Sequence, residues 1–172
     1  MDVIFLDIDG VLNSNDTPNR SAGGFIGVED QYLHRLNIIS QCTGADIILV
    51  SDWKSEWSAD ILKCKIDGAY LNNRFKEHEI KIIGKTNDRS VGDDARSGRG
   101  YGIKKFLEGH TVEQYVILDD VLFSDYDEEL RRHLVLTDNG LTDDDVEVAV
   151  DILAGKLLDD SYSLTERDIW KD

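Results

Sequence analysis

Four short apolar runs limit the folds that this chain of 172 residues can adopt. They are Val3–Leu6, Ile47–Val50, Tyr115–Leu118 and Leu134–Leu136, and none of them alternates cleanly with polar residues. Continuous apolar runs of this length are typical of strands that are buried on both faces of a parallel sheet. Ile80–Ile83 is a weaker candidate for a fifth strand.

Helical patterns lie between these runs. An amphipathic stripe predicts a helix over Glu29–Cys42, a shorter helix is expected after Trp57, and another over Tyr101–Glu108. The last helix has the clearest start, because Thr142 is a favourable N-cap and three aspartates follow it. The alternation of strands and helices predicts an α/β fold, a three-layer sandwich with a mostly parallel central sheet.

The length fits a single domain over residues 1–172. Two polar segments that contain glycine, 13–27 and 85–102, interrupt the alternation, and long loops of this kind commonly border a ligand site. Residues 55–98 are the candidate for a small cap or loop insertion in a domain that otherwise has no cap.

The cysteines and the N-terminus indicate the compartment. Cys42 and Cys64 form no CxxC pair, which fits a reducing compartment and no disulfide framework. The N-terminal residues turn acidic at Asp7 and do not resemble a signal peptide. Since no apolar run approaches the roughly 18 residues of a membrane span, we expect a cytoplasmic protein without a membrane partner.

The charge of the chain is strongly negative and uneven. The formal net charge is −16, and residues 111–172 alone hold 18 acidic against 5 basic residues. Most of these acids are expected on a solvated face. A protein of this charge repels phosphate backbones and anionic membranes, so direct binding of a long nucleic acid is not expected.

Polar residues follow three of the apolar runs. Asp7 and Asp9 follow the first run, Ser51 the second, and Asp119 and Asp120 end the third. Because parallel strands end at one edge of a sheet, these side chains can converge, and Asp7 and Asp9 project to the same side of an extended chain. Carboxylates so close to one another require a cation, and an all-oxygen site suits Mg²⁺.

A hairpin is the alternative for the first of these stretches. Asp-Gly between apolar residues is a strong hairpin signal, so Ile4–Asn13 could form two antiparallel strands. Val3–Leu6 lacks the alternation of a hairpin strand, and a polar stretch follows Leu12 at once. Both observations favour a buried strand that ends in a site.

Five stretches carry a resemblance to a known family. In chain order they are Asp7-x-Asp9-Gly10-Val11-Leu12-Asn13, Ser51-Asp52-Trp53-Lys54, Arg99-Gly100, Leu118-Asp119-Asp120 and Gly140-Leu141-Thr142. Together they resemble the signatures of the haloacid dehalogenase (HAD) superfamily of phosphohydrolases, and especially the small HAD domains related to RNA-repair phosphatases. The resemblance spans most of the chain.

The resemblance implies roles for the four aspartates. Asp7 would be the nucleophile that forms an aspartyl-phosphate, and Asp9 would protonate the leaving oxygen and later activate water. Mg²⁺ would be held by Asp7, by the backbone carbonyl of Asp9 and by one acid of the pair that follows. We favour Asp120 over Asp119 as that ligand, although the sequence does not separate them.

The resemblance also implies groups that bind the phosphate. Ser51 would donate to a phosphate oxygen, and it is also a candidate N-cap of a helix. The cation that stabilises the phosphoryl charge is favoured to be Arg99, whose guanidinium can bind phosphate through two donors. Lys104 and Lys54 are the alternatives. Trp53 or Trp57 could stack on a nucleobase at the mouth of the site.

Three functions follow from these expectations. The first is a Mg²⁺-dependent phosphatase (a phosphoric monoester hydrolase) acting on a small phosphorylated metabolite or nucleotide. The second is a polynucleotide end phosphatase of nucleic-acid repair, which the charge disfavours. The third is a non-catalytic phospho-acceptor domain of the receiver type, but there the acidic pair follows the first strand, whereas here it comes late. The oligomeric state stays open.

Overall fold

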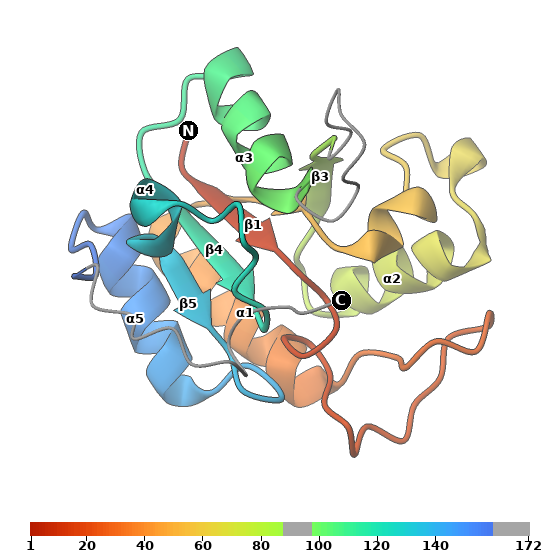
Figure 1. Ribbon diagram of the computed structural model, residues 1–172. Helices are drawn as coiled ribbons and strands as arrows, with labels where there is room; N and C mark the ends of the chain where they lie inside the picture. The colour runs from red at the N-terminus through yellow and green to blue at the C-terminus, as the bar shows by residue number, and fades with distance from the viewer. Residues whose placement is uncertain (88–97, 160–172) are drawn as a thin grey trace.

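A parallel sheet of five strands forms the centre of the protein (Figure 1). The computed structural model describes residues 1–87 and 98–159. The strands are β1 (Val3–Leu6), β2 (Asp46–Leu49), β3 (Ile82–Lys85), β4 (Tyr115–Asp119) and β5 (Leu134–Leu136). Their order across the sheet is β3-β2-β1-β4-β5, and every pair is parallel.

Helices cover both faces of the sheet. They are α1 (Asp30–Thr43), α2 (Ile66–Glu77), α3 (Gly98–Gly109), α4 (Glu128–Arg131) and α5 (Asp143–Leu153). Figure 1 shows α1 and α5 on one face and α3 and α4 on the other. Ile4 and Leu6 pack in a core with residues of α1, α2 and α5, whereas Val3 and Phe5 pack with residues of α3 and α4. Successive side chains of β1 thus point to opposite faces of the sheet and pack against both helical layers. The predicted α/β sandwich is confirmed.

The position of β1 determines where the polar strand ends meet. β1 lies between β2 and β4, with Leu6 paired to Leu49 on one side and to Leu118 on the other. All four residues of β1 are fully buried, as expected for a strand with helices on both faces. The residues that follow β1, β2 and β4 therefore lie side by side at one edge of the sheet.

Two regions differ from the sequence expectations. The short helix expected after Trp57 is a single 3₁₀ turn, Ile61–Lys63, whose Leu62 is 91% exposed, so its apolar residues are not core. Helix α2 follows it and was not predicted, because Leu71 and Phe75 are its only buried apolar residues and form too thin a stripe. The fifth strand begins at Ile82, two residues later than predicted.

The helix start after Thr142 is confirmed. The Thr142 hydroxyl accepts from the backbone N–H of Asp145, and the Asp145 carboxylate accepts from the backbone N–H of Thr142, which forms a capping box. Of the segment 55–98, residues 55–87 contain α2 and β3, and β3 is part of the central sheet. Within the described ranges no helix is both long and apolar enough to cross a membrane. Residues 88–97, in the predicted polar loop, lie outside the described residues.

Candidate active site

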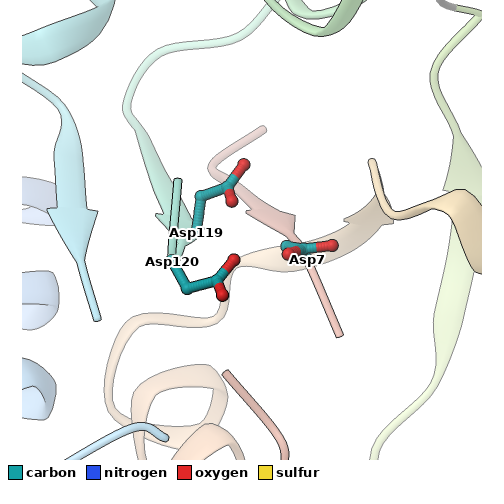
Figure 2. A group of neighbouring side chains, drawn as sticks. All are labelled: Asp7, Asp119 and Asp120. Carbon is teal, nitrogen blue, oxygen red and sulfur yellow. The ribbon is translucent and has the colours of Figure 1, made fainter. Parts of the chain in front are cut away.

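Three carboxyl groups meet at the carboxyl ends of β1 and β4. Asp7 follows β1, Asp119 is the last residue of β4, and Asp120 follows it. One oxygen from each of the three lies within 4.8 Å of the other two. Figure 2 shows the three side chains around a common space. The parallel pairing brings them together, because the backbone N–H of Asp7 donates to the carbonyl of Leu118 at 2.9 Å.

Two carboxyl groups of the cluster have raised pKa values. Burial raises the pKa of Asp7 well above its usual range, and the charge of Asp119 raises it further, while Arg99 acts in the opposite direction. Burial, and after it the charge of Asp119, raises the pKa of Asp120 to about 6. Three oxygen donors whose charges repel one another are the donor set that a hard divalent cation such as Mg²⁺ binds.

Among the described residues, Arg99 places a cation beside this cluster. Its Nη1 atom lies 2.9 Å from Oδ2 of Asp119 and 3.4 Å from Oδ1 of Asp7, and its side chain is buried. Its Nη2 atom lies 3.7 Å from the exposed carboxylate of Asp52. The guanidinium carbon lies 4.5 Å from the centroid of the Phe123 ring. The guanidinium of Arg99 thus lies beside both the Phe123 ring and the carboxylate of Asp7, the predicted nucleophile.

Asp119 accepts three hydrogen bonds from the part of the protein that the structure describes. Its Oδ2 atom accepts from Arg99 and, at 2.7 Å, from the hydroxyl of Tyr126, and its Oδ1 atom accepts from the backbone N–H of Val121. Asp120 is partly covered and more exposed than Asp119, and its carboxylate lies against Gly10. A Cβ atom on Gly10 would come within 2.1 Å of Oδ2 of Asp120, and Gly10 has φ +78°, so this turn requires glycine. Asp120 is therefore freer than Asp119 to bind a ligand.

A close approach of α3 to a loop places Arg99. The backbone N–H of Tyr101 donates to Oδ2 of Asp125, which caps the first turn of the helix. A Cβ atom on Gly100 would come within 2.3 Å of the carbonyl oxygen of Asp125, so only glycine allows the helix to approach this loop. The described helix begins at Gly98, three residues before the predicted start, because the low helix propensity of the glycines masked it.

Lys104, the alternative phosphate cation, lies elsewhere. It is on α3, five residues after Arg99, and five residues turn an α-helix by about 140° beyond a full circle. Its ammonium therefore faces away from the carboxyl cluster and pairs with Asp127, the N-cap of α4. The structure thus brings Arg99 to the carboxyl cluster and places Lys104 beside Asp127, and the role of either residue in phosphate binding stays a prediction.

Ser51 and Lys54 lie at the neighbouring strand end. Ser51 is buried, and its hydroxyl accepts from the backbone N–H of Trp53 at 3.3 Å, so it caps the 3₁₀ turn Asp52–Ser55, as the N-cap interpretation predicted. Its binding of phosphate stays a prediction. The ammonium of Lys54 donates to the carbonyl of Val50 at 3.4 Å.

Asp9 has partners that the sequence did not predict. Its Oδ1 atom accepts from the side-chain amide of Asn13 at 2.9 Å, and its Oδ2 atom accepts from the indole N–H of Trp53 at 3.3 Å. Trp53 is 4% exposed, so its ring is not available to stack on a nucleobase. Trp57 is equally buried, and its indole N–H donates to Asn72. The base-stacking expectation is therefore wrong for both.

A cavity of about 310 Å³ opens beside Asp9 and Asp120. It is lined mainly by polar residues of the loop after β1 and the loop after β5, which include Asn13, Asn15 and Asn139. A larger cavity of about 650 Å³, between the residues around Trp57 and helix α2, contains none of the predicted catalytic, metal-binding or phosphate-binding residues. Of these two cavities, the smaller one is therefore the one that Asp9 and Asp120 border.

The family comparison matches residues 3–146 to the HAD domain in Swiss Army Knife RNA repair proteins. The chain belongs to this family. It is therefore a hydrolase domain of the HAD superfamily, and the resemblance seen in the sequence is confirmed. A solved structure from Legionella pneumophila, described as a HAD superfamily (subfamily III A) hydrolase, is 15% identical, with a TM-score of 0.42 over 90% of this chain and 82% of that one. No curated protein matches the chain.

Proposed function

We propose that this HAD domain is a Mg²⁺-dependent phosphatase that hydrolyses a phosphomonoester of a small molecule through a phosphorylated Asp7. The observation that carries the proposal is the position of the buried Asp7, which lies beside two further carboxyl groups and 3.4 Å from the Arg99 guanidinium. A carboxylate nucleophile needs a cation beside it when the substrate is also an anion. Family membership gives no support to the receiver-like alternative.

The donor set fits a Mg²⁺ ion. Asp7 and Asp120 would bind it through carboxylate oxygens, and the backbone carbonyl of Asp9 is the third expected ligand. Asp119 would not bind the ion directly, since its oxygens already accept hydrogen bonds from Arg99, Tyr126 and the backbone. When bound, Mg²⁺ offsets the negative charge of the carboxylates and of the phosphate, which lets two anions approach each other.

Each protein group then has a defined task. An oxygen of Asp7 bonds to phosphorus while the bond from phosphorus to the leaving oxygen breaks, and a proton from the Asp9 carboxyl moves to that oxygen. The Asp9 carboxylate next takes a proton from water as the water oxygen bonds to phosphorus and the bond to Asp7 breaks. Arg99, and by our proposal the Ser51 hydroxyl, stabilise the charge on the phosphoryl oxygens.

The surroundings of the site favour a substrate with a single phosphate. The cavity beside Asp9 is lined by Asp120 and Asp138 and by neutral amides, with no lysine or arginine among the described residues that line it. A second phosphate in that cavity would meet the carboxylates of Asp120 and Asp138, which repel it. A leaving group with neutral hydroxyl or amide functions would find hydrogen-bond partners there.

A polynucleotide end phosphatase is the second candidate. The observation in its favour is the family, which is described from RNA repair proteins. The net charge of −16 opposes it, because a nucleic-acid strand adjoining the terminal phosphate would have to approach a strongly acidic protein.

A hydrolysis panel tests both candidates. The panel contains an aryl phosphate, nucleoside monophosphates, sugar phosphates and a 3′-phosphorylated oligonucleotide, each with Mg²⁺ and with excess chelator. We expect turnover of the small phosphates that the chelator and Asp7→Asn both abolish, with Asp144→Asn on the exposed start of α5 as the matched control. Turnover that survives Asp7→Asn would refute the nucleophile, and preference for the oligonucleotide would favour the second candidate.

A further inference from the structure

Two neutral donors hold both oxygens of the Asp9 carboxyl. Asp9 lies in the loop after β1 and is exposed, so on its own the side chain would exchange among rotamers. The amide of Asn13 donates to one oxygen and the indole of Trp53 to the other. One donor on each oxygen fixes both the position and the plane of the carboxyl group.

The two donors are themselves fixed. The Trp53 ring is buried, and its centroid lies 5.4 Å from that of Phe25 and 6.3 Å from that of Tyr70. Asn13 is 2% exposed, and its Oδ1 atom accepts from the backbone N–H of Gly10 at 2.9 Å. Because that backbone group can only donate, the amide nitrogen of Asn13 must be the atom that faces Asp9.

The contact with Trp53 joins two separate parts of the fold. Trp53 lies in the 3₁₀ turn Asp52–Ser55, after β2, whereas Asp9 follows β1. The loop between β1 and α1 closes over this contact, because the Asn13 amide also donates to the carbonyl of Ile26, and Phe25 lies beside the Trp53 ring. Asp9, Asn13 and Ile26 line the same cavity as Asp120.

We propose that Trp53 and Asn13 are positioning residues that hold the Asp9 carboxyl against this cavity, where it meets the oxygen of the leaving group. This inference rests on the proposed function. Each oxygen of the Asp9 carboxyl keeps a second lone pair, which can carry the proton that moves to the leaving oxygen as the bond between phosphorus and that oxygen breaks. The hydrogen bonds from Trp53 and Asn13 can stay in place during this transfer. Because both donors are uncharged, they orient the carboxyl without placing a cation beside it.

The dependence on the leaving group separates positioning from a structural role. An alkoxide is a poor leaving group and requires the proton, whereas p-nitrophenolate leaves without one. A misplaced Asp9 therefore slows the cleavage of alkyl phosphates selectively. The parameter to compare is kcat/KM, because it reports the steps up to departure of the leaving group and is not affected by the later hydrolysis of phosphorylated Asp7.

Trp53→Phe is the first variant, since it retains an aromatic ring and removes the N–H. We expect kcat/KM for an alkyl phosphate to fall by about 10-fold or more, and for p-nitrophenyl phosphate by less than about threefold. In an Asp9→Asn background, Trp53→Phe should cause no further loss with the alkyl phosphate, because the two residues act as one unit. Trp57→Phe is the matched control: its indole is equally buried but donates to Asn72, so both substrates should keep their rates.

A second variant keeps the test valid if Trp53→Phe does not fold. Benzothienylalanine at position 53 replaces the indole N–H by sulfur in a side chain of nearly the same shape. Equal losses with both phosphates, or additive losses in the Asp9→Asn background, would overturn the positioning role and leave the phosphatase proposal standing. A wild-type protein without phosphatase activity, or activity that survives Asp7→Asn, would overturn both.

Discussion

Removing the hydroxyl of Tyr126 measures how much its hydrogen bond to Asp119 contributes to the stability of the protein. It donates to Oδ2 of Asp119 at 2.7 Å, and Tyr126 and Asp119 are 1% and 0% exposed, so water cannot replace the hydroxyl. Tyr126→Phe keeps the ring packing and removes one hydrogen bond to a buried carboxylate. Hydrogen bonds to charged groups contribute about 1.5–3 kcal/mol. Asp119 keeps its bonds to Arg99 and to the backbone N–H of Val121, so we expect a loss of about 2 kcal/mol in the free energy of unfolding.

Urea unfolding with and without the substitution measures this loss. The midpoint should fall while the m-value stays the same, because the surface exposed on unfolding does not change. For a domain of this size, a loss of about 2 kcal/mol corresponds to a Tm lower by roughly 4–8 °C. Tyr101→Phe, at a half-buried tyrosine on α3, is the control. A loss below about 0.5 kcal/mol for Tyr126→Phe would refute the claim that this hydroxyl anchors Asp119.

Four further predictions concern the metal, the stability of the protein without it, and the phosphate. Since burial and Asp119 raise the pKa of Asp120 to about 6, protons compete with Mg²⁺ below that pH, and calorimetric titration should show weaker binding at pH 5 than at pH 8. For the same reason, the stability of the metal-free protein should fall as the pH rises through about 6, and added Mg²⁺ should restore it. Gly10→Ala forces Asp120 out of its position, so Mg²⁺ affinity measured in the same way should fall; unchanged affinity would contradict the assignment of Asp120. Arg99→Lys should lower kcat/KM about 100-fold, whereas Lys104→Ala should leave it unchanged, and the reverse result would restore Lys104.

The sheet and its acidic edge could be predicted because their causes are local. Strands covered by helices on both faces require continuous apolar residues, which is why Val3–Leu6 and Leu134–Leu136 have the predicted bounds. Parallel pairing of neighbouring strands then brings Asp7 next to Asp119 and Asp120, although more than a hundred residues separate them. No more than the strand pattern and the order of the acids was needed.

The remaining features depend on contacts that leave no periodic trace. Choosing Arg99 over Lys104 requires knowing where α3 begins. The glycines at its start hide this from the sequence, because glycine has a low helix propensity, and Gly100 is present to allow a close approach to Asp125. The hydrogen bond from Trp53 to Asp9 depends on the 3₁₀ turn after β2, which places the indole N–H next to the loop after β1. For a tryptophan near acidic residues, the sequence spacing does not show whether its indole N–H donates a hydrogen bond or its ring stacks on a base.

Trapping of the phosphorylated protein tests the central claim most directly. The protein is mixed with Mg²⁺ and an excess of a turned-over phosphate, quenched in acid during the steady state, digested, and analysed by mass spectrometry. The proposal predicts one added phosphoryl group on Asp7, removed by hydroxylamine as expected for an acyl phosphate and absent in Asp7→Asn. Steady turnover with no phosphoryl group on Asp7, or with that group on another residue, would contradict it.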